Sequence, residues 1–168
     1  MELIKTFFGK HEKVTKKVLL VIIIVLLLVF GFRYVSYLKE IKIAELEQKG
    51  LALKVGEKTL YLEVVATPTK HYFGLSNRPS LCEDCGMLFI FSSLKEREFV
   101  MRNMEFPLDI VFIRNNQIVK VYENLAPEGN TPTNYYDSSQ AINYVIELNA
   151  GMANEFGLKE GATIDLPF

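Results

Sequence analysis

Two cysteines separated by two residues are the first candidates for chemistry in this sequence of 168 residues. Cys82 and Cys85 stand in the stretch LCEDCGMLF, directly before an apolar run typical of a strand. Such a pair can bind a metal, exchange thiol for disulfide, or form a local disulfide. Tetrahedral zinc needs four ligands, and within one chain only His71 with Glu83 or Asp84 could complete the set. We therefore expect neither a metal nor another cofactor, and keep metal binding as an alternative.

A thiol oxidoreductase of the thioredoxin type carries its Cys-x-x-Cys motif where a helix opens after a strand. Here the motif precedes a strand, in a region rich in strand patterns. Outside the cytoplasm, paired cysteines are usually oxidised. We predict that Cys82 and Cys85 form a local disulfide that pins the turn before the strand, with thiol exchange as the alternative. Closing so short a loop puts the stabilisation at the low end of the usual range of about 0 to 5 kcal/mol.

Several polar side chains stand inside otherwise apolar blocks and form the second group of candidates. Asp109 lies between Leu108 and Ile110, where a carboxylate is costly to bury unless it is paired. In one interpretation, Asp109 or Glu147 pairs with an arginine or accepts backbone N–H groups and so locks the sheet. In the other, carboxylates and guanidinium groups converge on a ligand pocket. The predicted ligand-binding residues are Arg78, Met101, Arg102, Asn103, Asp109, Tyr135 and Glu147.

A long loop at 125–140, rich in Pro, Gly, Asn and Ser, contributes Tyr135 to this group. Tyr135 and Tyr136 stand beside Asn134 and Asp137, a combination suited to a platform for a carbohydrate or a peptide. The alternative is that one tyrosine packs over the end of the sheet. We expect this loop to contact a partner.

Patterns that indicate catalysis are sparse. His71 is the only histidine after the N-terminal region, and no serine stands in a Gly-x-Ser-x-Gly elbow. Asp109 and Glu147 could act as an acid/base pair in hydrolysis, provided that the fold brings them together. We favour binding over catalysis. The alternatives are an envelope thiol oxidoreductase or hydrolase, including a nucleophilic cysteine with His71, and a purely structural domain.

The elements that must position these residues are mostly short strands. Alternating or β-branched runs occur at 59–67, 86–91, 109–124 and 142–149, and the third folds back at Asn115 and Asn116. A short helix near 150–156 precedes a last predicted strand at 162–168. The predicted fold is mainly β: a compact β-barrel-like or curled antiparallel sheet with one or two short helices.

An apolar segment at 18–32 precedes this region and contains no charged side chain. As a helix it covers about 22 Å, which is short of a hydrocarbon core of about 30 Å, so flanking residues must enter the span. Lysines before it can extend their side chains to one interface, and Tyr34 and Tyr37 suit the other. We predict an uncleaved transmembrane anchor at about 14–36, because the residues that follow offer no small-residue site for signal peptidase.

The distribution of charge predicts orientation and partners. Lysines at 5, 10, 13, 16 and 17 precede the span, and fewer basic residues follow it closely, which predicts a cytoplasmic N-terminus and an extracytoplasmic C-terminal domain at the cell membrane. The predicted parts are a basic tail at 1–13, the anchor at 14–36, a helical stalk at 37–54 and the β-rich domain at 55–168. A net charge of −1 gives no basic field for nucleic acid. Expected partners are the lipid bilayer through 18–32 and a small molecule, a glycan or an envelope protein.

Five sequence blocks occur in an order known from one family. They are GLSNRPSL (74–81), GMLFIF (86–91), FVMRNMEFPLDIVFI (99–113), VIELNAG (145–151) and GLKEGATIDL (157–166). Together they resemble the domain of unknown function 192 family, also called uncharacterised protein family 0127, over residues 55–168. The resemblance implies a secreted or membrane-anchored protein and brings no established activity. The family usually has an aromatic residue, often Trp, where this chain has Val100, which implies an altered pocket or packing wall.

Overall fold

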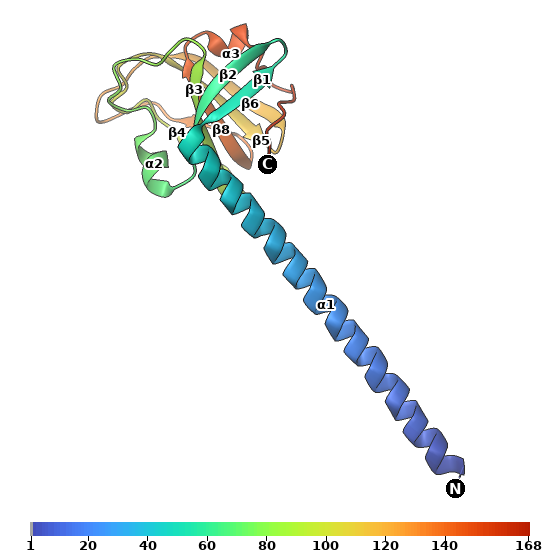
Figure 1. Cartoon of the computed structure of the whole chain (residues 1–168). Helices are drawn as coiled ribbons and strands as arrows, with labels where there is room; N and C mark the ends of the chain where they lie inside the picture. Colours follow the sequence, from blue (N-terminus) through green and yellow to red (C-terminus); the bar gives the residue numbers. More distant parts are fainter. Residues whose placement is uncertain (1) are drawn as a thin grey trace. The chain divides into compact units, whose positions relative to one another are not determined.

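The computed structural model describes the backbone of residues 2–168 and the side chains of residues 17–168. The chain divides into two compact units, one up to Lys42 and one from Ile43 to Phe168, which we describe separately. Helix α1 (Glu2–Lys49) forms the first unit and enters the second (Figure 1).

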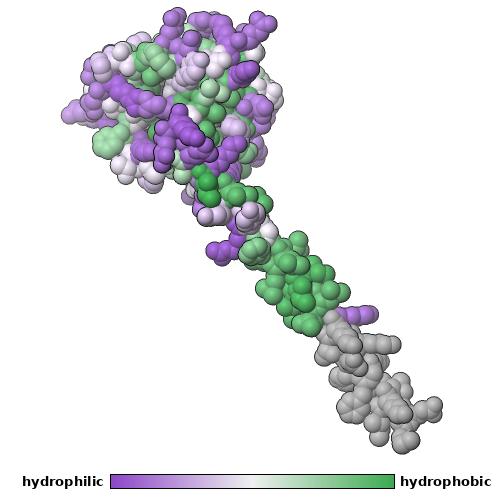
Figure 2. All heavy atoms as spheres, in the orientation of Figure 1, coloured by the Kyte–Doolittle hydropathy of each residue, from purple (hydrophilic) through white to green (hydrophobic). Residues whose placement is uncertain are grey.

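Within α1, the stretch from Lys17 to Lys49 is long and apolar enough to cross a membrane, with a mean hydropathy of 2.9 in its most apolar window. None of that window is buried against other parts of the chain. Figure 2 shows the result as a continuous band of hydrophobic side chains around the helix. The prediction of one long apolar N-terminal helix is confirmed.

The end of α1 belongs to the second unit. Gly50 adopts a φ of 74° and its N–H donates to the carbonyl of Leu46 at 2.8 Å, which ends the helix. One turn earlier, the Oε1 atom of Glu47 accepts from the backbone N–H of Ala66 at 2.8 Å and lies 3.2 Å from the Nζ atom of Lys70. Residues 43–49 are therefore tied to the domain by hydrogen bonds.

A six-stranded sheet forms the core of the second unit. Its spatial order is β1 (Leu51–Val55), β2 (Lys58–Val65), β3 (Cys85–Lys95), β8 (Ile142–Asn149), β5 (Leu108–Arg114) and β6 (Gln117–Leu125). Two short strands, β4 (Glu98–Phe99) and β7 (Tyr136–Asp137), pair separately. The helices of this unit are α2 (Pro68–Phe73) and α3 (Met152–Glu155).

The predicted curled sheet with short helices is confirmed, whereas the barrel-like alternative is wrong because the sheet is open. The pairing of β2 with β3 is parallel, so the sheet is mixed, although the prediction described it as antiparallel. Strands β1 and β6 are its two edges, and among the described residues no pairing joins them. β2 and β3 run parallel because residues 66–84, with α2, carry the chain back to the starting end of β2. The predicted turn at Asn115 joins β5 to β6, whereas the predicted last strand amounts to a single bridge between Gln117 and Thr163.

Two buried clusters lie on opposite faces of the sheet because side chains alternate along each strand. Glu63, Met87, Glu147 and Ile110 stand in register across β2, β3, β8 and β5. The face of the sheet that carries these four side chains packs against Leu75, which follows α2 in the chain. The other face packs against α3 and the residues at the end of the chain.

Asp109 lies on the face that packs against α3 and is fully buried. Its Oδ1 atom accepts from the N–H of Asn124 and its Oδ2 atom from the N–H of Ala153, both at 2.8 Å. Asp109 therefore joins β5 to the end of β6 and to α3. This arrangement matches the structural interpretation, in which the carboxylate accepts backbone N–H groups.

Candidate functional site

A cavity of about 470 Å³ opens on the face of the sheet opposite Asp109. Its wall comprises residues 71–76 of α2 and the segment after it, residues 96–100 around β4, and Phe91, Arg102, Met104 and Glu147. A volume of this order is typical of small-molecule sites. The wall of the cavity is thus formed in part by the segment that connects β2 to β3 and in part by the central strand β8.

Glu147 is the ionisable residue that a central strand, β8, contributes to the wall of this cavity. It pairs with Met87 of β3 and Ile110 of β5, and it is only 6% exposed. Its Oε2 atom is buried and has no hydrogen-bond partner. Burial raises the pKa of Glu147 to about 8, against the opposing effect of the charge on Arg78. The carboxyl is therefore mostly protonated at neutral pH and can donate a hydrogen bond.

Gly74 brings the backbone close to this carboxyl. Thr67 caps the start of α2, Pro68 occupies its first turn, and Gly74 ends the helix with a φ of 49°. A Cβ atom at Gly74 would lie 3.5 Å from the Oε2 atom of Glu147 and 3.3 Å from the ring of Phe89. The positive φ favours glycine here, and a Cβ atom would also press on the ring of Phe89.

Arg97 contributes a second buried polar atom without a partner. Its guanidinium carbon lies 3.7 Å from the ring centroid of Phe91, and its Nη2 atom donates to the carbonyl of Ser93 at 3.1 Å. The Nε atom is buried and has no hydrogen-bond partner. Desolvation lowers the pKa of Arg97, which remains charged at neutral pH. The side chain of Arg97 is thus held in the cavity wall by contacts with Phe91 and Ser93, while its Nε–H stays without a partner.

The apolar part of the wall is aromatic. Phe99 packs edge-on against Phe89 and Phe112, with ring centroids 5.1 and 5.6 Å away. His71 lies 4.5 Å from Phe91 between ring centroids, and its Nε2 atom is 3.1 Å from the carbonyl of Val65. Because a carbonyl only accepts, Nε2 carries the hydrogen. Burial lowers the pKa of His71, so its ring is neutral at pH 7 and serves as part of the wall.

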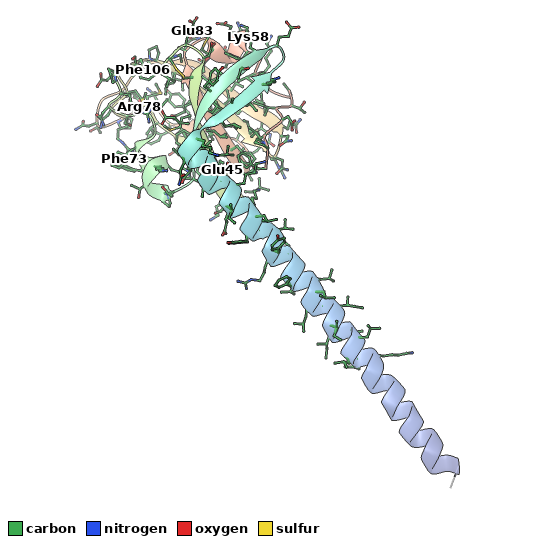
Figure 3. All side chains as sticks on the ribbon, in the orientation of Figure 1. Glu45, Lys58, Phe73, Arg78, Glu83 and Phe106 are labelled. Atoms are coloured by element: carbon green, nitrogen blue, oxygen red, sulfur yellow. A yellow bond between two sulfur atoms is a disulfide. The ribbon has the colours of Figure 1, made fainter. Side chains whose placement is uncertain are left out.

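Two other arginines lie around the cavity. Arg102 donates to the carbonyl of Tyr72 at 3.1 Å and stacks on the ring of that residue at 4.1 Å. Arg78 donates from both terminal nitrogens to the two oxygens of Glu63, with Nη2 to Oε2 at 2.8 Å. This hydrogen bond lowers the pKa of Glu63. Arg78 lines a second hollow of about 550 Å³ (Arg78 and Phe73 are labelled in Figure 3). Phe73 and Gly74 line both this hollow and the cavity.

The structure brings together only part of the predicted ligand-binding set. Glu147 and Arg102 line the cavity and Arg78 lies beside it, whereas Asp109 is on the other face. Met101 is fully buried in the core next to the cavity. Asn103 has a φ of 51° and hydrogen-bonds through its backbone to Asn77 and Gly129, and Tyr135 is 60% exposed.

Sequence reasoning missed three groups of the cavity. Arg97 lies in a charge-rich run, 95–98, of a kind that is typical of a solvent-exposed surface. His71 was considered only as a zinc ligand or as the partner of a nucleophilic cysteine, and not as part of a cavity wall. The special backbone of Gly74 was present in the GLSNRPSL block without an assigned role. The atypical Val100 does lie in the cavity wall.

The two cysteines lie together at the start of β3. The structure joins their sulfur atoms, with Cα atoms 5.1 Å apart, a separation that a disulfide allows. The N–H of Cys85 donates to the carbonyl of Cys82, and the side chain of Asn149 donates to the same carbonyl at 2.9 Å. The pair therefore closes the turn that leads into β3. Within residues 17–168, no group of three or more His, Cys, Asp or Glu side chains is arranged to hold a metal.

The chain belongs to the domain of unknown function 192 family, described as "Uncharacterized ACR", whose sequence profile matches residues 51–166. A crystal structure described as a proposed transcription regulator from Sinorhizobium meliloti is 30% identical, with a TM-score of 0.61 over 68% of this chain and 89% of that one. A protein of unknown function from Novosphingobium aromaticivorans is 28% identical, with a TM-score of 0.58 over 64% and 76%. No curated protein matches this chain.

Replacement of Glu147 by Gln should remove a pH-dependent destabilisation. Because the pKa of this carboxyl is about 8 when folded and 4.5 in its unperturbed state, the folded protein binds more protons between these values and loses stability as the pH rises. We expect Glu147→Gln to raise the free energy of unfolding relative to wild type by an amount that grows from pH 5 to pH 9, up to about 5 kcal/mol.

Urea unfolding of the full chain in detergent, at several pH values, measures this difference. Glu83→Gln, on the exposed loop between the cysteines, is the matched control and should show a difference independent of pH. A Glu147→Gln difference that is equally flat from pH 5 to pH 9 would contradict the protonated carboxyl.

Proposed function

We propose that this protein is a single-pass membrane protein whose domain, residues 51–166, binds a small molecule in the cavity above Glu147. The observation that carries the proposal is Glu147, a residue of the cavity wall whose buried Oε2 atom has no hydrogen-bond partner in the protein. Leaving such a polar atom without a hydrogen bond costs about 1 to 3 kcal/mol. Buried polar groups without partners are rare, and a ligand in the adjoining cavity, with or without a bridging water, could supply the missing bond.

The surroundings of this atom support binding rather than catalysis. Burial keeps the carboxyl protonated, so that it cannot act as a general base at neutral pH, and the only histidine in the wall, His71, already donates its ring N–H to Val65. The two buried acids lie on opposite faces of the sheet, so they cannot act as an acid/base pair on one substrate. A glycan or an envelope protein remains the alternative partner, and it would use the exposed loop around Tyr135.

The membrane placement is part of the same proposal. The helix from Lys17 to Lys49 has the length and composition of a span, and the lysines before residue 18 outnumber the basic residues that closely follow the span. By the positive-inside rule the N-terminus would be cytoplasmic and the domain extracytoplasmic. In that compartment the close pair Cys82 and Cys85 would be oxidised.

Filling the cavity should abolish ligand binding without unfolding the domain. Val100 lines the cavity and is partly exposed, so a tryptophan there can occupy the empty volume. We expect the wild-type chain in lipid nanodiscs to give saturable hits in a ligand-observed NMR screen of small fragments, and Val100→Trp to lose at least about tenfold in affinity for each, about 1.4 kcal/mol.

Leu94→Trp, at an exposed position of β3 outside the cavity lining, is the matched control and should keep the hits. Retention of every hit by a folded Val100→Trp protein would place binding elsewhere. A screen without any saturable, site-specific hit would reject the proposed function.

The orientation predicts which cysteine reagents react. We expect a membrane-impermeant maleimide added to intact cells to label Cys82 and Cys85 only after reduction, because the domain would be outside and the pair oxidised. A cysteine introduced at Thr6, in the N-terminal tail, should be labelled only after lysis. Labelling of the domain cysteines without reductant would reject the disulfide, and labelling only after lysis would reject the orientation.

A further inference from the structure

We infer that the ligand of this cavity is a small carboxylate with a flat apolar body, whose carboxylate forms a hydrogen bond with the side chain of Glu147. The inference rests on the proposed function and specifies its ligand. It follows from three features of the cavity: which polar atoms lack partners, which charges line the interior, and which aromatic faces are already covered.

The unpartnered atoms call for an acceptor. Among the described residues, three buried side-chain polar atoms lack a partner, and two of them belong to residues of the cavity wall: the Oε2 atom of Glu147 and the Nε atom of Arg97. The arginine N–H is a donor at any relevant pH, and the neutral carboxyl of Glu147 donates through its O–H. A ligand oxygen satisfies either group, whereas a ligand N–H can satisfy only the carboxyl.

The charges of the interior favour an anion over a neutral acceptor. Arg97 and Arg102 are partly buried in the wall, while the acids of the same wall, Glu96 and Glu98, are exposed to solvent. Glu147 is neutral at pH 7, and the electrostatic effect of Arg78 reaches its carboxyl. The half-buried charges of the cavity are thus positive, and hydrogen bonds between a protonated donor and an ionised acceptor are about twice as strong as neutral ones.

A cationic ligand fits less well, although aromatic side chains often bind ammonium groups. The face of Phe91 is covered by Arg97 at 3.7 Å and that of Tyr72 by Arg102 at 4.1 Å. An ammonium group would have to displace these guanidinium groups and also ionise Glu147. The remaining wall, with Phe99, is apolar and suits a flat hydrophobic body.

The test compares three probes of nearly the same shape: 4-fluorobenzoate, 4-fluorobenzamide and 4-fluorobenzylammonium. Fluorine NMR of each probe with the full chain in nanodiscs at pH 7 gives its dissociation constant. We expect the benzoate to bind at least tenfold more tightly than the benzamide, the benzylammonium to show no saturable binding, and Val100→Trp to abolish the benzoate signal.

A pH series gives a second readout specific to Glu147. The titratable and charged groups around it are Glu63, His71, Tyr72, Arg78, Glu96, Arg97, Glu98 and Arg102. The pKa values of Glu63 and His71 are lowered, so neither changes charge above pH 7, and the arginines stay protonated. We therefore expect the affinity for the benzoate to fall about tenfold between pH 7 and pH 9 in wild type, as Glu147 ionises, and to stay constant in Glu147→Gln.

The outcomes separate the inference from the proposed function. If the benzamide or the benzylammonium saturates the cavity and the benzoate does not, the carboxylate class is wrong and the binding function stands. Saturable benzoate binding with the same pH profile in wild type and Glu147→Gln would also overturn the inference, because the carboxylate would then not contact Glu147. Absence of saturable binding by all three probes would count against both.

Discussion

The burial of one carboxyl group in the middle of the sheet constrains the rest of this site. Glu147 occupies a central strand, flanked by Met87 and Ile110, and its Oε2 atom has no partner in the protein. Because an ionised carboxylate is expensive to bury without a partner, the group is held protonated at neutral pH. Gly74 brings the chain close to this carboxyl, and both residues line the cavity.

The two buried acids of the domain illustrate two uses of the same functional group. Asp109 accepts a backbone hydrogen bond on each oxygen, at 2.8 Å, and so fixes α3 and the end of β6 to β5. Glu147, on the opposite face, keeps an oxygen without a partner and borders a cavity. A satisfied buried acid stabilises the fold, whereas an unsatisfied one is retained at a cost to stability. The second arrangement is the one expected where a ligand completes the hydrogen bonding.

Much of the fold could be predicted from local patterns, because alternation and turn residues are properties of neighbouring residues. These local patterns predicted β2, the start of β3, the β5–β6 hairpin and β8. The order of the sequence blocks predicted the family. The face on which each acid lies depends on register between distant strands, so the separation of Asp109 from Glu147 was not predictable. The parallel pairing of β2 with β3 and the role of Arg97 likewise depend on the crossover and on long-range packing.

The protonation of Glu147 is the central claim, and the carboxyl carbon of that residue reports on it directly. With glutamate labelled by ¹³C at the side-chain carboxyl, the full chain in nanodiscs can be titrated by NMR, and the resonance of Glu147 assigned by its absence in Glu147→Gln. The structure predicts a midpoint near pH 8, far above the unperturbed value of 4.5. A midpoint near 4.5 would mean that the buried carboxyl is ionised at neutral pH and would contradict the account.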